Sequence, residues 1–215
     1  MKKMTKMSVL FMLVALFTCP VFAQKDEAAQ KDLKTKATRS ARKEAKKYMK
    51  DGFYVANGAL PLDKQLENAW LKQLTLDEDG LPQYIVETGN SVAETQTAAK
   101  IQAQETAKLN IAGTITTQVA ALIENNIANQ QLNNEDAASV TKVVAASKNL
   151  IAQELGRTLM LIEMYKKIGK NVECDIRLAY DYKNAKETAK KVIRQELEKQ
   201  TDILQKKLDG LMNFN

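Results

Sequence analysis

The sequence predicts an α+β fold in which a small antiparallel sheet, one strand plus a long hairpin, packs with long α-helices and is preceded by a basic helical arm. Two observations predict this class. Residues 159–168 and 172–182 are predicted strands around a short connection that contains glycine, which is typical of a β-hairpin, and residues 172–178 alternate apolar and charged side chains. Longer stretches repeat apolar residues at helical spacing, at 91–126, 137–155 and 184–209.

The first 23 residues predict an export signal. Lysines at the start precede an apolar run over residues 8–17, and Val21-Phe22-Ala23 ends in the small residue that signal peptidase requires. We therefore expect a signal peptide over residues 1–23, a mature chain that begins at Gln24, and a location in the periplasm or cell envelope.

Cys19 offers a different interpretation of the same segment. The sequence Leu16-Phe17-Thr18-Cys19 loosely matches the motif that precedes a lipidated cysteine, although threonine is a poor fit beside that residue. Cleavage after Ala23 is favoured and lipidation at Cys19 stays open. An uncleaved membrane anchor is disfavoured, because about 17 apolar residues are needed to span a bilayer and Pro20 interrupts this shorter run.

Charge argues against a nucleic-acid partner. The chain has 32 basic and 26 acidic residues, and removal of Lys2, Lys3 and Lys6 with the signal peptide leaves 29 basic residues and a net charge of +3. The basic excess of the full sequence therefore belongs partly to the signal peptide, and we expect no nucleic-acid binding outside the cytoplasm.

Residues 24–50 form the predicted basic arm. Ten lysines and arginines stand against four acids there, with alanines between them and few large apolar side chains. Such a segment is typical of a solvated helix or a mobile arm. Its alternative function is electrostatic contact with an anionic membrane surface or an acidic partner.

Residues 51–80 predict a short strand and a helix. Phe53-Tyr54-Val55 is strand-like, Asn57-Gly58 is a turn signal, and Asp63 is the expected N-cap of a helix whose Trp70 packs onto the main domain.

The main domain is expected over residues 81–215 and opens with a strand at 84–88. Gly89-Asn90 is expected to end this strand, and Ser91 and Glu94 match a capping box that starts a long helix to about Asn126. Alanine at every fourth position, Ala99, Ala103 and Ala107, predicts a close approach of this helix to a sheet or to another helix.

A second helix is expected to end at Gly156 as its C′ residue, and the hairpin follows. We expect a three-residue connection, Gly169-Lys170-Asn171, with Ile168 opposite Val172 and Glu163 opposite Arg177. This register gives one apolar face, which holds Met160, Ile162, Met164, Ile176 and Leu178, and one face of opposite charges.

The last helix is expected from about Asn184 to Asp209. Leu197, Leu204 and Leu211 form a heptad repeat, but only one position repeats cleanly. Packing onto the chain's own sheet is therefore favoured, and an oligomer formed through the helices is the alternative.

The chemistry available to this chain is limited, because it contains no histidine. Catalysis by Ser-His-Asp or Cys-His and the commonest zinc ligand are excluded, and no phosphate-binding glycine loop is present. We expect no enzyme, no cofactor and no metal site.

Cys174 alternates with Glu173 and Asp175 and is expected to be a buried core thiol. A carboxylate hydrolase built from Glu163, Glu173 and Asp175 on one hairpin face is a minor alternative.

The order of these elements resembles a known family. Gly89 after a strand, an alanine-rich helix, a polar connection, a second helix and a hairpin with Val172-x-Cys174-x-Ile176-x-Leu178-x-Tyr180 resemble the LPP-twenty family of secreted bacterial envelope lipoproteins, over residues 82–183. That family includes flagellar outer-membrane accessory proteins. Residues 52–66 are also similar to secreted proteins of gut-type Gram-negative bacteria. The resemblance implies an α+β domain at the outer membrane or in the periplasm and supplies no catalytic residues.

The expected function is that of a non-enzymatic protein that scaffolds or binds other envelope components, through an envelope protein partner or an anionic membrane surface. The alternative is a domain that binds a small ligand or a glycan. Four aromatic residues are its candidate contacts, namely Tyr54, Trp70, Tyr84 and Tyr165.

Overall fold

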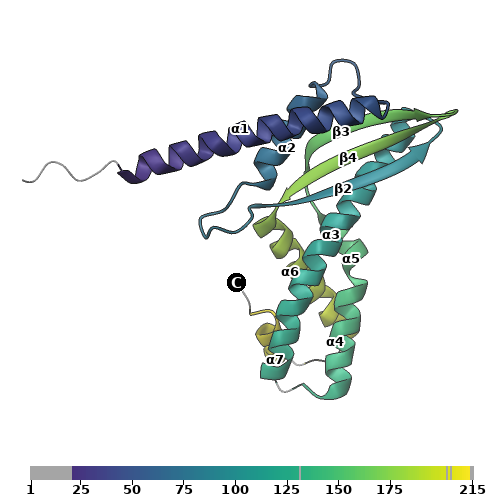
Figure 1. The fold of residues 1–215 in the computed structure, drawn as a ribbon. Coiled ribbons are helices and arrows are strands. Elements are labelled where there is room, and N and C mark those ends of the chain that lie inside the picture. Colours follow the sequence, from purple (N-terminus) through teal and green to yellow (C-terminus); the bar gives the residue numbers. More distant parts are fainter. Residues whose placement is uncertain (1–20, 131, 202, 204, 214–215) are drawn as a thin grey trace, which may run out of the picture. The chain divides into compact units, whose positions relative to one another are not determined.

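The computed structural model describes residues 21–130, 132–201, 203 and 205–213. It has two compact units, residues 1–36 and residues 37–215. Most of the predicted signal peptide, including Cys19, lies outside the described residues. In the first unit, residues 21–36 belong to helix α1 (Val21–Lys50), which continues into the second unit (Figure 1). All other elements lie in the second unit.

The second unit is an α+β domain, as the sequence predicts. Its four-stranded antiparallel sheet has the order β1-β3-β4-β2, with β1 (Phe53–Tyr54), β2 (Tyr84–Ala93), β3 (Leu159–Ile168) and β4 (Asn171–Asp181). The strand-like run after Asp51 is thus the edge strand β1, in which Phe53 pairs with Lys166. The two long strands β3 and β4 are the predicted hairpin.

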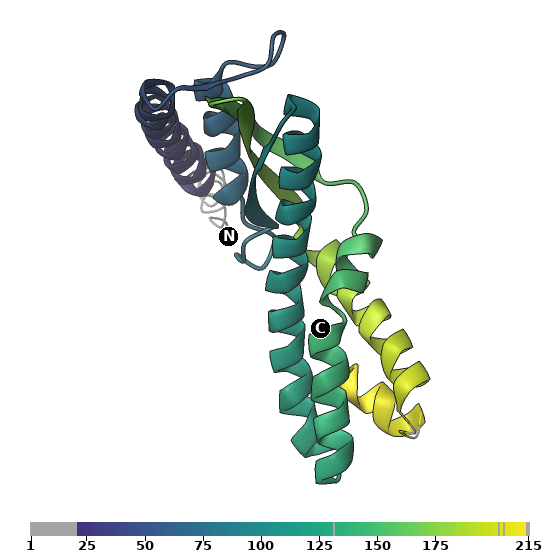
Figure 2. The same ribbon diagram turned by 90° about the vertical axis from the view of Figure 1, so that its right-hand side faces the viewer.

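Helices cover both faces of this sheet. On one face lies α3 (Gln96–Asn129), and on the other lie the last turns of α1 together with α2 (Leu62–Gln73). Figure 2 shows α2 and α3 on opposite sides of the strands. Tyr165, Cys174 and Ile176 point toward α3, whereas Ile162 and Met164 point toward α1 and α2. The sheet therefore separates two apolar clusters.

The predicted alanine stripe of α3 packs on the sheet at Gly89. Ala99, Ala103 and Ala107 are fully buried. A Cβ atom at Gly89 would overlap the carbonyl oxygen of Ala103. Small residues on both elements let the two backbones approach closely.

The same contact explains why the expected end of the strand at Gly89 is wrong. Strand β2 continues to Ala93 because Gly89 meets a helix there and does not turn. The capping box is also wrong. Ser91 lies in the strand and donates its hydroxyl to the carbonyl oxygen of Ala99 at 2.5 Å, while Thr95 caps α3 by accepting from the backbone N–H of Ala98.

The register expected for the hairpin is wrong by one residue. Ile168 pairs with Asn171, so only Gly169 and Lys170 form the turn, and Gly169 has a φ of +60° that favours glycine. The shorter turn places Glu163 opposite Ile176 and Met164 opposite Asp175. Charged side chains pair with the helices instead of across the strands: Glu163 with Lys100 of α3, and Arg177 with Glu44 of α1. Because helices cover both faces of the sheet, neither face is the solvent-exposed face of opposite charges that the expected register required.

The helical part extends beyond the sheet. It consists of the second half of α3 with α4 (Asn134–Ala146), α5 (Lys148–Glu154), α6 (Tyr182–Gln200) and α7 (Gln205–Leu211) (Figure 1). Buried Ile123, Val144, Leu197 and Leu211 belong to the same apolar cluster as the α3 face of the sheet. The C-terminal helices thus pack on the chain's own core.

Several helix ends differ from expectation. The second helix is divided at Ser147 into α4 and α5, and Gly156 does not have the positive φ of a C′ glycine. Pro61 precedes α2 without a side-chain cap, so Asp63 lies in the first turn and is not the N-cap. Asp181 caps α6 by accepting from the N–H of Asn184.

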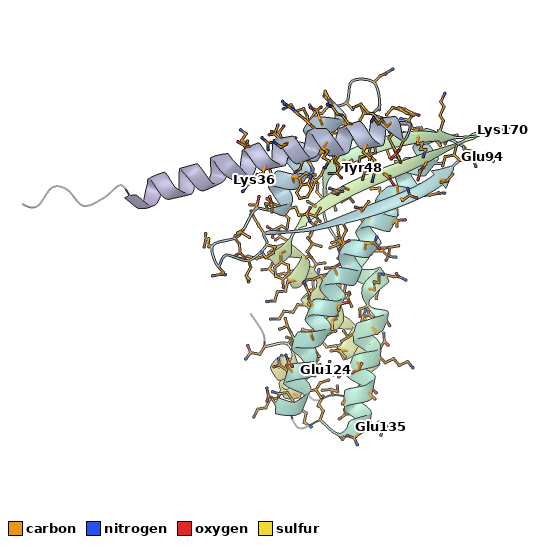
Figure 3. All side chains as sticks on the ribbon, viewed as in Figure 1. Lys36, Tyr48, Glu94, Glu124, Glu135 and Lys170 are labelled. Carbon is orange, nitrogen blue, oxygen red and sulfur yellow. The ribbon has the colours of Figure 1, made fainter. Side chains whose placement is uncertain are left out.

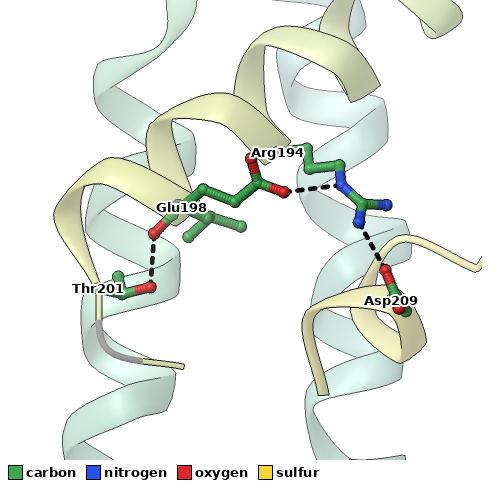
Figure 4. Close-up of polar contacts among 5 residues, drawn as sticks. Arg194, Glu198, Thr201 and Asp209 are labelled. Carbon is green, nitrogen blue, oxygen red and sulfur yellow. Dashed lines mark hydrogen bonds and ion pairs between the residues drawn. The ribbon is translucent and has the colours of Figure 1, made fainter. Parts of the chain in front are cut away.

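The last helix is likewise divided, and Leu204 of the heptad lies outside the described residues. Arg194 joins the two parts, because its guanidinium donates to Glu198 at 3.0 Å and to Asp209 of α7 at 2.6 Å (Figure 4). The Thr201 hydroxyl donates to the Leu197 carbonyl oxygen and closes the end of α6.

Candidate functional site

The last turns of α1 have a buried face that the sequence analysis overlooked. Ala37, Ala41 and Ala45 are 3%, 0% and 1% exposed. Ala41 and Ala45 belong to the apolar cluster of α2 and the sheet. Residues 37–50 are helical, as one form of the prediction has it, but they pack on the domain and are not a solvated or mobile arm. The signal was present in the alanine spacing of four, but the lack of large apolar side chains made the segment resemble a solvated helix.

Polar contacts fix this helix on the domain. The Thr38 hydroxyl donates to the buried carboxylate of Glu67 at 2.7 Å, and Lys64 also donates to Glu67 at 2.8 Å. Glu44 accepts from the indole N–H of Trp70 at 3.1 Å. Helix α1 is thus joined to α2 at two separate turns.

Glu44 also connects α1 with the sheet. Its other carboxylate oxygen lies 3.8 Å from the guanidinium of Arg177 on β4. Beside it, the ring of Tyr48 contacts the ring of Phe53 edge-on, with centroids 5.5 Å apart. Burial and the carboxylate of Glu44 raise the pKa of Tyr48. Because these contacts come from two elements besides α1, they set the rotation of the helix about its axis.

The opposite face of α1 is a basic surface. It consists of six exposed cations, and we call them the basic face: Arg39, Arg42, Lys43, Lys46, Lys47 and Lys50. Their spacing of i, i+3, i+4, i+7, i+8 and i+11 places them on one side of the helix, opposite the buried alanines. They span about 17 Å at the usual helical rise. None of the six forms an ion pair with any residue that the structure describes.

The aromatic candidates do not form one platform. Tyr54 and Tyr165 lie opposite each other on the α3 side of the sheet, with ring centroids 6.0 Å apart, and Tyr165 is only 1% exposed. Trp70 and Tyr84 lie on the other side, where Lys72 donates to the hydroxyl of Tyr84 at 3.1 Å. The sheet separates the two pairs, and Trp70 packs on the main domain as expected.

A polar group lies beneath α3 around Tyr165. Its hydroxyl donates to Glu163 at 2.6 Å, and Glu163 forms an ion pair with Lys100 at 2.7 Å. Burial and this hydrogen bond raise the pKa of Tyr165. The carboxylate of Glu163 is thus held between Lys100 of α3 and Tyr165 of β3, so these contacts join α3 to the hairpin.

Cys174 is buried on the α3 face, as predicted, and is fully inaccessible. Burial, followed by the negative charges of Glu163 and Asp175, raises the pKa of its thiol to about 12. A buried thiol with a raised pKa is a poor nucleophile at neutral pH.

The three carboxylates of the hydrolase alternative do not gather. Glu163 faces α3, whereas Glu173 and Asp175 lie on the other face of the sheet, where the side-chain amide of Asn90 donates to both. Burial raises the pKa of Asp175. Within the described part of the chain, no group of three or more potential metal ligands from His, Cys, Asp and Glu occurs.

A groove of about 450 Å³ lies between α3 and α4. Its apolar lining includes Ile123, Val140 and Val144, and its polar lining includes Glu124 and Lys148. Figure 3 places Glu124 and Glu135 at the end of the helices that is far from the hairpin tip at Lys170. The groove and the basic face therefore lie on different parts of the second unit.

Comparisons with protein-family models, with curated proteins and with solved structures found no match to this chain. Among the helices in the described part of the chain, none combines the length and the apolar character that crossing a bilayer requires.

Proposed function

We propose that this protein is a non-enzymatic protein of the periplasm or cell envelope that binds an anionic envelope component through the basic face of α1. The observation that carries the proposal is the pair of opposite faces on one helix: buried alanines on one side and six exposed cations on the other. Export by residues 1–23 and the resemblance to the LPP-twenty family are further parts of this proposal, and both rest on the sequence.

The packing of α1 on the sheet favours binding of an anionic partner. A mobile basic arm loses conformational freedom when it meets a partner, whereas α1 already presents its cations in one row. Each exposed charge contributes little by itself, but a row of like charges produces a field that attracts anions. The mature net charge of +3 is modest, so the local concentration of charge matters more than the total.

Several contacts support a role without catalysis. The candidate carboxylates are held on opposite faces of the sheet, and Glu163 is paired with Lys100. Cys174 is protonated and buried. These groups have structural roles in the core, which leaves the exposed helix faces as the surfaces for partners, including further copies of the chain.

The groove between α3 and α4 supports the second candidate function, which is binding of a small ligand. Its size and apolar lining suit a small hydrophobic molecule better than a glycan, since the four aromatic candidates do not line it.

Charge-swapped variants test the proposal. Deleting the whole arm is unsuitable, because it would remove Ala41 and Ala45 from the core. Lys43, Lys46 and Lys47 are instead changed to glutamate, and the control changes three exposed lysines of α4 and α6, namely Lys142, Lys183 and Lys191. Both variants have the same net charge. We expect the α1 variant alone to lose capture of components from an envelope extract. Equal capture by both variants would disprove the role of the basic face.

A further inference from the structure

The hairpin tip and the C-terminal end of α1 lie at the same end of the sheet. Phe53 pairs with Lys166, so the residues just before Phe53 run alongside Lys167 and Ile168. Lys167 pairs with Val172, and Val92 of β2 pairs with Glu173. Figure 3 shows Lys170 and Glu94 together at this end. We call it the hairpin end, and it is defined by residues 46–51, 92–94 and 166–171.

Exposed apolar side chains occur at the hairpin end on three separate elements. Met49 of α1 is 55% exposed, Val92 of β2 is 46% exposed, and Ile168 of β3 is 43% exposed. Exposed lysines surround them, namely Lys46, Lys47, Lys50, Lys167 and Lys170. Asp51 and Glu94 are the exposed acids there. The exposed residues alone, five positive and two negative, sum to +3, and the half-buried Lys166 lies opposite the half-buried Glu173.

A loop at the other end of the sheet is acidic. The loop that leads into β2 exposes Leu76 and Leu81, each at 57%. Acidic residues lie between these leucines, at Asp77, Glu78 and Asp79. The two ends thus expose comparable apolar side chains, and charge distinguishes them.

We propose that the hairpin end is a docking surface for an anionic lipid bilayer, with Met49, Val92 and Ile168 entering the interfacial region and the lysines contacting the head groups. This inference rests on the proposed function and names its partner. A bilayer interface accepts scattered apolar side chains, and lysine stems lie along the apolar region while their ammonium groups reach the phosphates.

A bilayer fits the shape of this surface better than a protein does. The three apolar residues lie on separate elements, and the groove between α3 and α4 lies elsewhere in the unit. An adaptable lipid surface needs no matching groove. The adjoining basic face of α1 extends the positive surface, and each lysine near an anionic membrane is worth about a fivefold gain in affinity.

The first test measures whether a label at a single position enters the lipid bilayer. Ile168→Cys and, as the control, Leu81→Cys are labelled with an environment-sensitive fluorophore in the mature protein, where Cys174 is buried and should not react under native conditions. Vesicles of phosphatidylcholine alone are compared with vesicles that also contain phosphatidylglycerol. We expect a blue shift at position 168 with the anionic vesicles only, and none at position 81. No shift at position 168, or equal shifts at both positions, would overturn the inference.

The second test uses unlabelled variants. Ile168→Ser should lower the partition onto anionic vesicles about fivefold, while Leu81→Ser leaves it unchanged and both variants keep the thermal stability of the wild type. If the wild type does not bind the vesicles but still captures an envelope protein through the basic face, the lipid inference fails and the proposed function stands. If the variant with Lys43, Lys46 and Lys47 changed to glutamate keeps both the vesicle binding and the capture of envelope components that the wild type shows, the basic face is not the binding surface and the proposed function fails.

Discussion

The indole N–H of Trp70 donates to the carboxylate of Glu44 at 3.1 Å and joins two helices that are 26 residues apart in the sequence. The same carboxylate lies 3.8 Å from Arg177 of the sheet. One acidic residue within a basic segment therefore anchors that segment to the domain, and the basic side chains around it stay exposed.

Two truncations should separate the part of α1 that belongs to the first unit from the part that packs in the second unit. A chain that begins at Ala37 should keep nearly the wild-type melting temperature, because residues 1–36 form a separate unit. A chain that begins at Asp51 should lose cooperative unfolding or melt far lower, since Ala41 and Ala45 leave the core and Glu67 loses the hydroxyl of Thr38. Thermal unfolding followed by circular dichroism checks this. Equal melting temperatures for the two truncations would show that α1 is not part of the core.

Gly89→Ala should destabilise the domain by about 3 kcal/mol, the upper end of the usual cost of overpacking. The new Cβ would meet backbone atoms of Ala103 and Ala107, which cannot move aside as a flexible side chain can. Gly156→Ala is the matched control, because its Cβ would meet only the hydroxyl of Tyr180, at 3.5 Å. Urea denaturation gives both values, and a similar loss in the two variants would disprove the close packing of α3 on β2.

Ionisation of Cys174 should weaken the fold at high pH. The pKa of this thiol is raised from 9.0 to about 12 in the folded chain, so the folded state holds the proton more tightly than the unfolded state does. Its contribution is therefore complete below pH 9 and is lost as the pH rises from 9 toward 12. We expect the free energy of unfolding to fall less steeply over this range in Cys174→Ala than in the wild type. Identical slopes, or fast maleimide labelling of the native protein, would contradict the buried thiol.

The mature protein should begin at Gln24 and carry no lipid. The reason is the cleavage sequence Val21-Phe22-Ala23, together with the poor fit of Thr18 beside Cys19. Intact-mass measurement of the protein purified from its native envelope checks this, and an acylated chain that begins at Cys19 would contradict it.

The sequence was sufficient to predict the elements with strong periodicity. The hairpin strands and the long helix α3 lie where alternation and helical spacing place them. The burial of Cys174 follows from the same alternation. These features depend on local pattern, which a single sequence contains.

The register and the location of α1 depend on tertiary contacts and could not be predicted in this way. The charge argument paired Glu163 with Arg177 across the hairpin, but each finds its partner on a helix, Lys100 or Glu44. Ala41 and Ala45 are buried because α2 and the sheet leave room for small side chains only. These ion pairs and this burial cannot be read from any one segment of the sequence. They form only when helices pack on both faces of the sheet.

The most direct test of the central claim is the salt dependence of binding to anionic vesicles. Affinities of the wild type, of the α1 variant with Lys43, Lys46 and Lys47 changed to glutamate, and of the control variant with Lys142, Lys183 and Lys191 changed to glutamate are measured across ionic strengths, since the Debye length falls from about 30 Å at 0.01 M to about 8 Å at 0.15 M. We expect the affinities of the wild type and the control to fall steeply with salt, and the α1 variant to bind weakly at every salt concentration. The same affinity and the same salt dependence in all three proteins would contradict a binding role for the basic face of α1.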